Sequence, residues 1–214
     1  MEFPFFLLQV LVISLSGALA PGPVTAAAIG MGSRNRFAGV LMALGHGIVE
    51  FPLMVLLLFG VGQLLKLPAA KVVIGLAGGG FLIFLAVQMF RGLRNSDGQE
   101  VQVGRGSPLV AGIFLSAGNP YFLIWWATAG LALITTAKNN FGLWAFGLMA
   151  LTHWSCDFAW LTTLSWASFK GSVLLGPKRQ RIVLAVCAAA MLGIGLCFIV
   201  LQVITLEGMI RDSL

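Results

Sequence analysis

Long apolar stretches separated by short polar connectors run along the whole chain. Six of these stretches are long enough to cross about 30 Å of hydrocarbon as helices. They cover residues 5–29, 38–60, 72–90, 109–134, 141–169 and 182–204. The polar connectors between them are residues 33–36, 63–71, 91–107, 138–140 and 170–181. This pattern predicts an all-α integral membrane protein with six transmembrane helices.

Proline interrupts the first and the fourth of these expected helices. The first break is Pro21-Gly22-Pro23, and the second break is Gly118-Asn119-Pro120. Proline removes a backbone N–H and clashes with the preceding turn. Irregular backbone at membrane depth is tolerated only where it is buried in protein or lines a watery cavity, and transporters build substrate sites from such broken helices. A proline-kinked packing helix is the alternative interpretation.

The two halves of the chain carry matching features, which predicts an internal repeat. The first break corresponds to the second break, and a histidine precedes a carboxylate by four residues once in each half. These pairs are His46 with Glu50 in the second expected helix and His153 with Asp157 in the fifth. Because each half has three helices, the second half would cross the membrane in the opposite direction to the first. The repeats would therefore be inverted, as in many secondary transporters. We expect residues 1–106 and 107–214 to form the two repeats.

Composition supports a membrane protein and excludes several other classes. Of the 214 residues, 59% are hydrophobic and only 9% are charged, whereas a soluble chain carries about 25% charged residues. The net charge of +6 reflects cationic connectors, so it does not indicate a nucleic-acid partner. The 3 cysteines all lie in apolar stretches and do not form a disulfide framework. The expected partners are the lipid bilayer and a small molecule, and no cofactor is expected. The sequence leaves open whether the chain forms a homo-oligomer.

Basic residues are distributed unevenly between the connectors. The first, third and fifth connectors hold Arg34, Arg36, Arg91, Arg94, Arg105, Lys170, Lys178, Arg179 and Arg181; the second and fourth connectors and the C-terminal end hold Lys66, Lys71, Lys138 and Arg211. The positive-inside rule therefore predicts cytoplasmic odd connectors and both termini outside, in the cell (inner or plasma) membrane. Since Glu2 and no basic residue precedes the first apolar stretch, we interpret that stretch as a retained helix rather than a signal peptide.

Both histidine–carboxylate pairs are expected near the middle of the membrane. The spacing of four residues puts the two side chains of each pair on one helix face. A carboxylate at that depth costs at least about 2.5 kcal/mol, so such a residue is by default a candidate for function. The candidates are His46, Glu50, His153 and Asp157. The alternative is that each pair only satisfies its own hydrogen bonds within its helix.

The chain resembles the lysine and threonine exporters of bacteria and archaea, the LysE-type translocators. The resemblance spans nearly the whole chain and is carried by several short motifs. These are Pro21-Gly22-Pro23, residues 75–94 with Phe81-Leu82-Ile83-Phe84-Leu85, Asn119-Pro120, Asp157, and Gly176-Pro177-Lys178. It implies six helices in two inverted repeats and export of amino acids or related metabolites driven by an ion gradient. Two positions depart from the family pattern: Tyr121 stands where members often carry lysine, and the pair of His46 and Glu50 is not usual.

These observations predict a secondary transporter, not an enzyme, that exports a small amino acid or an amine-bearing metabolite in exchange for protons. The residues expected to bind the substrate are Pro21, Gly22, Pro23, Asn119, Pro120 and Tyr121. Glu50 and Asp157 would hold the amine or the coupling proton, and His46 and His153 would relay that proton. One alternative is a divalent metal exporter with His46, Glu50, His153 and Asp157 as ligands. Another is an intramembrane enzyme with a histidine–carboxylate base. The chain has no nucleotide-binding motif.

Overall fold

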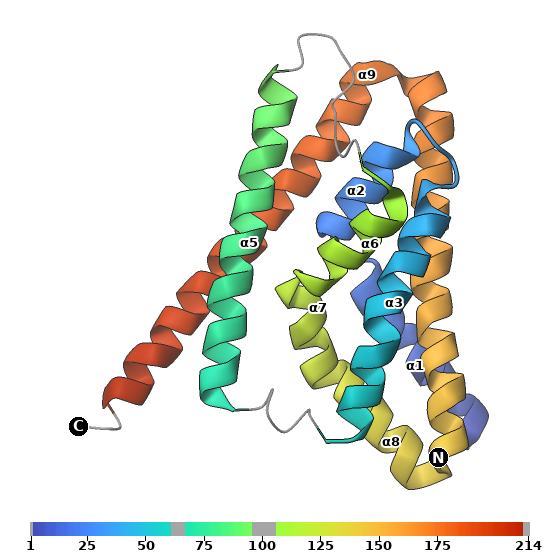
Figure 1. Cartoon of the computed structure of the whole chain (residues 1–214), viewed down its shortest axis with the longest axis vertical. Helices are drawn as coiled ribbons and strands as arrows, with labels where there is room; N and C mark the ends of the chain where they lie inside the picture. The colour runs from blue at the N-terminus through green and yellow to red at the C-terminus, as the bar shows by residue number, and fades with distance from the viewer. Residues whose placement is uncertain (1, 61–66, 96–105, 212–214) are drawn as a thin grey trace.

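The computed structural model describes residues 2–60, 67–95 and 106–211, and its regular structure there is entirely helical. In chain order the helices are α1 (Phe3–Ala18), α2 (Pro23–Gly32), α3 (Ala38–Leu58), α5 (Pro68–Asn95), α6 (Pro108–Ala117), α7 (Pro120–Trp125), the π-helix η1 (Trp126–Gly130), α8 (Leu131–Phe141) and α9 (Leu143–Arg211). Figure 1 shows them as a bundle of long helices around the short helices α2, α6 and α7. The predicted all-α class is confirmed.

The first expected helix is broken where the sequence predicted it. Helix α1 ends at Ala18 and α2 begins at Pro23, and the two helix axes meet at 75°. Pro23 occupies the first turn of α2, where a missing N–H leaves no hydrogen bond unmade. Gly22 precedes it in an extended conformation as the N-cap.

The second predicted break is also present, between Ala117 of α6 and Pro120 of α7. Beyond it, α7, η1 and α8 follow one another without interruption as far as Phe141. The predicted connector at residues 138–140 is therefore wrong. The chain leaves the helix only at Gly142, whose φ of +91° is one that residues with a side chain rarely adopt.

Helix α9 contains both of the last two expected helices. Helical structure continues through residues 170–181, where the sequence predicted a connector. Figure 1 nevertheless shows α9 reversing its direction at one end of the molecule. We call residues 143–171 the rising arm and residues 181–211 the descending arm. The sequence therefore predicted the reversal correctly but was wrong that the helix stops there.

Four helical segments of the described chain are long and apolar enough to cross a membrane, or five if α1 and α2 count as one bent span. They are Ala38–Leu58, Val72–Arg94, Pro120–Phe141 and Leu184–Gly208. The rising arm of α9 is not among them, because His153 and Asp157 lower its mean hydropathy. The molecule is thus a multi-pass helical membrane protein, and the count of six spans stays a prediction.

Close backbone contact between α3 and α6 positions the centre of the molecule. Gly45 of α3 lies against the backbone of Leu109, and Gly112 of α6 lies against the backbone of Met42, so a Cβ at either glycine would collide with main-chain atoms. This approach brings His46, next to Gly45, within reach of α6. The other face of α3 packs on the rising arm of α9, where Gly39 lies against Leu161.

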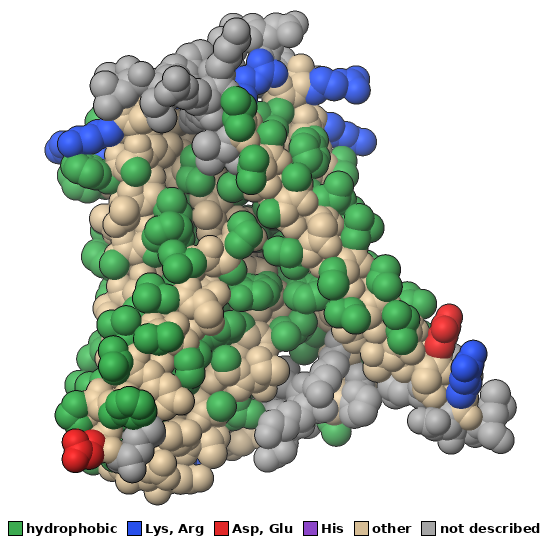
Figure 2. Space-filling model, turned by 180° about the vertical axis from the view of Figure 1, so that it is seen from behind, with side chains coloured by type: hydrophobic (Ala, Val, Ile, Leu, Met, Phe, Trp, Pro, Cys, Tyr) green, Lys and Arg blue, Asp and Glu red, His purple; other side chains and the backbone are tan. Residues whose placement is uncertain are grey.

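Charged and apolar side chains are segregated on the surface. Figure 2 shows most of the visible Lys and Arg side chains at one end, one further basic side chain at the opposite end, and apolar side chains over the long faces between them. The segment between α2 and α3, the C-terminal end of α5, the start of α6 and the turn of α9 lie at that end, whereas α8, the start of α1 and the end of α9 lie toward the other (Figure 1). The described segments that carry Arg34, Arg36, Arg91 and Arg94 and the turn of α9 therefore lie on one side of the expected bilayer. We refer to this as the basic end.

Candidate functional site

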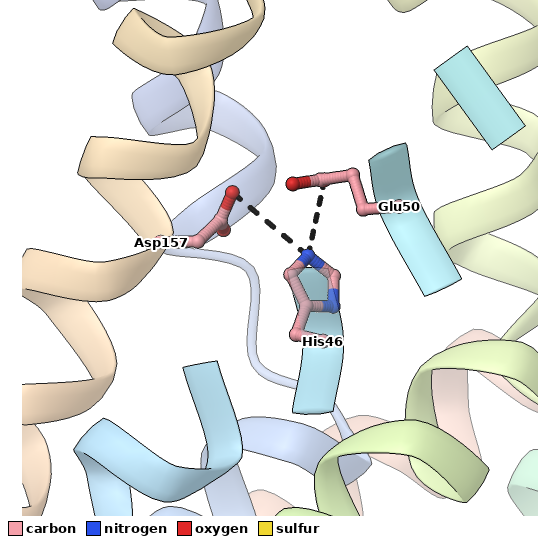
Figure 3. Close-up of side chains that lie close together, drawn as sticks. All are labelled: His46, Glu50 and Asp157. Atoms are coloured by element: carbon pink, nitrogen blue, oxygen red, sulfur yellow. Dashed lines mark hydrogen bonds and ion pairs between the residues drawn. The ribbon is translucent and has the colours of Figure 1, made fainter. Parts of the chain in front are cut away.

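The four ionisable side chains predicted from the sequence converge at one point between α3 and the rising arm of α9. Glu50 Oε1 lies 3.1 Å from His46 Nε2 and 3.1 Å from His153 Nε2. Asp157 Oδ2 lies 3.3 Å from His153 Nε2 and 3.9 Å from His46 Nε2. Figure 3 shows His46, Glu50 and Asp157 pointing toward one another from these two helices. The two pairs predicted within helices thus form a single cluster across helices.

Glu50 accepts a further hydrogen bond that the sequence did not predict. Trp126 Nε1 donates to Glu50 Oε1 over 3.2 Å. Both side chains are fully buried. The sequence analysis did not identify the indole N–H of Trp126. Its position in η1 orients it, and such π segments are frequent at functional sites.

Each histidine is also held by a buried serine from the opposite half of the chain. His46 Nδ1 lies 2.7 Å from Ser116 Oγ in α6, and His153 Nδ1 lies 2.8 Å from Ser14 Oγ in α1. Ser116 Oγ in turn donates to the Gly112 carbonyl over 2.6 Å. Sequence reasoning missed both serines. The one signal that the sequence offered is that Ser14 and Ser116 each lie in the helix that ends at a proline break.

Aromatic rings of α7 and η1 fix the imidazole rings further. Trp125 stacks on His153 with ring centroids 4.8 Å apart and 29° between the planes. Trp126 meets His153 edge-on at 4.8 Å, and Phe122 meets His46 edge-on at 5.1 Å. The two histidines therefore have little rotational freedom.

One cavity of about 70 Å³ joins the two breaks to the ionisable cluster. Its lining includes Pro21, Gly22, Pro23, Asn119 and Tyr121, together with His46, Glu50, His153 and Asp157. Nine of the ten sequence-predicted site residues thus surround one space. Pro120 does not line it, because its ring packs against Gly78 of α5.

The two helix N-termini at the cavity differ in their capping. Asn119 Oδ1 accepts the Tyr121 backbone N–H over 3.1 Å, so the first turn of α7 is capped by a side chain. Gly22 provides no such cap for α2, whose first-turn residues Val24 and Thr25 line the cavity. A helix N-terminus with free N–H groups attracts anions. The N-terminus of α2 is therefore the one that presents backbone N–H groups without a side-chain cap to this cavity.

Two buried carboxylate oxygens of the cluster lack a hydrogen-bond partner: Glu50 Oε2 and Asp157 Oδ2. Asp157 Oδ2 is within ion-pair distance of both imidazoles but not in hydrogen-bonding geometry. Unsatisfied buried acceptors are costly, so the site is suited to a ligand that brings donors or positive charge. His46, Glu50 and Asp157 also offer ligand atoms that all lie within 4.8 Å of one another, which is compact enough for a metal ion.

Fold and site together define a multi-pass helical membrane protein with an ionisable cavity between two broken helices. The chain belongs to the LysE type translocator family, whose sequence profile matches residues 15–202. It is 27% identical over 203 residues to the protein of Bacillus subtilis (strain 168) named "Putative amino acid efflux protein YcgF", covering 89% of this chain and 93% of that protein. No solved structure matches. The resemblance seen in the sequence motifs is confirmed.

Proposed function

We propose that this protein is a secondary transporter that exports small amino acids or related amine-bearing metabolites in exchange for protons. The observation that carries the proposal is the cavity between the two breaks. It is lined by a helix N-terminus without a side-chain cap and by two carboxylates that each have an oxygen without a hydrogen-bond partner. A zwitterionic amino acid carries the two complementary groups. The similarity to a protein named for amino acid efflux supports the same cargo class.

Each end of the cargo has a counterpart in the cavity. The carboxylate would accept hydrogen bonds from the first-turn N–H groups of α2, at Val24 and Thr25, and would benefit from the positive end of the helix dipole. The ammonium would donate to the Asp157 carboxylate, which lines the cavity. This pairing would bring positive charge to a carboxylate that lacks a hydrogen bond at Oδ2.

Size and polarity of the cavity favour small cargo. About 70 Å³ is far below the 300–1,000 Å³ of sites for drug-sized ligands. Apart from the polar groups already named, apolar side chains such as Leu82, Leu161 and Ile194 surround the space. A short apolar or small polar side chain fits these walls better than a long charged one, because a charge would meet no partner there.

Exchange of cargo for protons would result from competition between a proton and the cargo ammonium for Asp157. A proton and a cargo ammonium both neutralise Asp157, so the carboxylate holds one or the other and is rarely left as a bare charge in the membrane interior. Alternating exposure of the cavity to the two sides would then couple outward movement of cargo to inward movement of protons.

We also propose that residues 1–106 and 107–214 form two inverted three-helix repeats with six membrane crossings. The reciprocal pairs between halves, His46 with Ser116 and His153 with Ser14, are what a two-fold relation between the repeats would produce. The shared breaks before α2 and α7 support the same relation.

The basic end of the molecule motivates a prediction about sidedness, with the basic end in the cytoplasm and both termini outside the cell membrane. In a variant without Cys156, Cys187 and Cys197, single cysteines at the exposed positions Arg94 and Lys138 should differ in labelling. In intact cells, an impermeant thiol reagent should modify Lys138→Cys and leave Arg94→Cys unmodified. Both should react once the membrane is permeabilised. The opposite pattern in intact cells would reverse the proposed topology.

Transport by purified protein in loaded liposomes tests the proposed function. Efflux of radiolabelled amino acids and of divalent metal ions should be measured in parallel, with and without an inward proton gradient. We expect efflux of at least one small amino acid, faster with the gradient, and no efflux of Zn²⁺, Ni²⁺, Co²⁺ or Mn²⁺. Gradient-dependent metal efflux without any amino-acid efflux would replace the proposed cargo by a metal ion.

A further inference from the structure

The two carboxylates of the cluster are not equivalent. Glu50 Oε1 has three nitrogen atoms around it, His46 Nε2 at 3.1 Å, His153 Nε2 at 3.1 Å and Trp126 Nε1 at 3.2 Å. Asp157 Oδ2 has no hydrogen bond in the described structure, and the Asp157 side chain keeps 13% of its surface exposed whereas that of Glu50 keeps none. Glu50 Oε1 is therefore surrounded by donors, whereas Asp157 is the carboxylate whose side chain keeps exposed surface and lacks a hydrogen bond at Oδ2.

Counting hydrogen-bond donors places a proton between His46 and Glu50. The Ser116 hydroxyl hydrogen is used on the Gly112 carbonyl, so its oxygen must accept from His46 Nδ1–H. The other ring nitrogen, Nε2, then faces Glu50 Oε1 at 3.1 Å. Two acceptors at this distance would repel each other, so a proton lies between them. With an ionised Glu50, that proton belongs to His46, and the ring is an imidazolium.

His153 needs no positive charge to complete its contacts. Its Nε2 faces the same Glu50 oxygen and must donate to it, whereas its Nδ1 can accept from the Ser14 hydroxyl at 2.8 Å. In the described structure Ser14 Oγ makes no other side-chain hydrogen bond. The neutral ring with its proton on Nε2 satisfies both contacts.

We propose that Glu50 is a permanently ionised anchor that holds His46 as an imidazolium and His153 as the neutral Nε2–H ring, so that Asp157 alone exchanges proton and cargo. Glu50 and His46 then compensate each other, as a buried charge requires. Trp126, Ser116 and Ser14 are positioning residues for this arrangement. The role of Asp157 rests on the proposed function, whereas the states of the rings do not depend on it.

The chain offers a direct test because it contains only 2 histidines. Protein labelled with ¹⁵N-histidine, purified through a tag that has no histidine and placed in lipid nanodiscs, gives ring signals from His46 and His153 alone. Nitrogen NMR distinguishes protonated from unprotonated ring nitrogens. His46→Asn and His153→Asn each remove one set of signals and so assign the spectrum. No cargo is added, so this measurement is separate from transport.

At neutral pH we expect three protonated ring nitrogens and one unprotonated nitrogen, the latter being Nδ1 of His153. Glu50→Gln should remove the second proton of His46 and give two of each kind. Asp157→Asn should leave the count of the wild type unchanged. Any other count in the wild-type protein, or loss of the His46 proton in Asp157→Asn, would overturn the proposal. The wild-type count decides the matter even if Glu50→Gln does not fold. Absence of amino-acid efflux alongside the expected count would instead reject only the proposed function.

Discussion

Replacing Asp157 by asparagine is expected to lower the rate of amino-acid export about 10- to 100-fold. The asparagine side chain would keep the shape of the aspartate but lose the charge that receives the cargo ammonium. A hydrogen bond to a charged group contributes about 1.5–3 kcal/mol, and each 1.4 kcal/mol corresponds to roughly a factor of ten. The measurement is the initial rate of efflux from liposomes, at equal amounts of folded protein and with an inward proton gradient.

The same variant should separate cargo exchange from proton coupling. An asparagine at this position mimics a carboxyl group that always carries its proton, so whatever export remains should no longer respond to the gradient. Ser155→Ala is a suitable control, since Ser155 lies two residues away on the exposed face of α9 and bonds only to the Thr152 carbonyl in the described structure. Unchanged acceleration by the gradient in Asp157→Asn would place the coupling proton elsewhere.

Much of this site could be predicted from the sequence because its signals are local. A proline within an apolar stretch changes the backbone wherever it occurs, so both breaks were predicted at the residues where α2 and α7 begin. Spacing of four residues put His46 and His153 each on the helix face of its carboxylate, and both contacts are present. An ionisable residue in a membrane span is rare enough to indicate function by itself.

The parts that were missed depend on contacts between distant segments. Nothing local to Trp126 distinguishes an indole that packs from one that donates to Glu50, 76 residues earlier. Ser14 and Ser116 are likewise ordinary small polar residues until their helices cross those of the histidines. The predicted connector at residues 138–140 was wrong for another reason. Lys138, Asn139 and Asn140 are polar but compatible with a helix, and α8 ends only at Gly142.

Gly78→Ala is also expected to lower the rate of export strongly. It would do so by displacing the break between α6 and α7, although Gly78 itself does not touch the cargo. In a helix interior, alanine is normally more stable than glycine by about 1 kcal/mol. Here the new Cβ would enter the ring of Pro120, and a proline ring is not a flexible side chain that can turn aside. The collision must shift α7 or α5, and Asn119, Tyr121 and the rings that hold the histidines would shift with α7.

Gly80→Ala provides the matched control, because Gly80 lies two residues further along α5 with nothing within 4 Å of an added Cβ. Both variants change helix propensity equally, so any difference between them reports the contact with Pro120. A displacement of about 1 Å at a site can cost roughly 100-fold in rate, so export per folded Gly78→Ala protein should fall by about that order. Gly80→Ala should export like the wild type and melt at a slightly higher temperature. Equal export by the two variants would mean that the position of the second break does not set the geometry of the cavity.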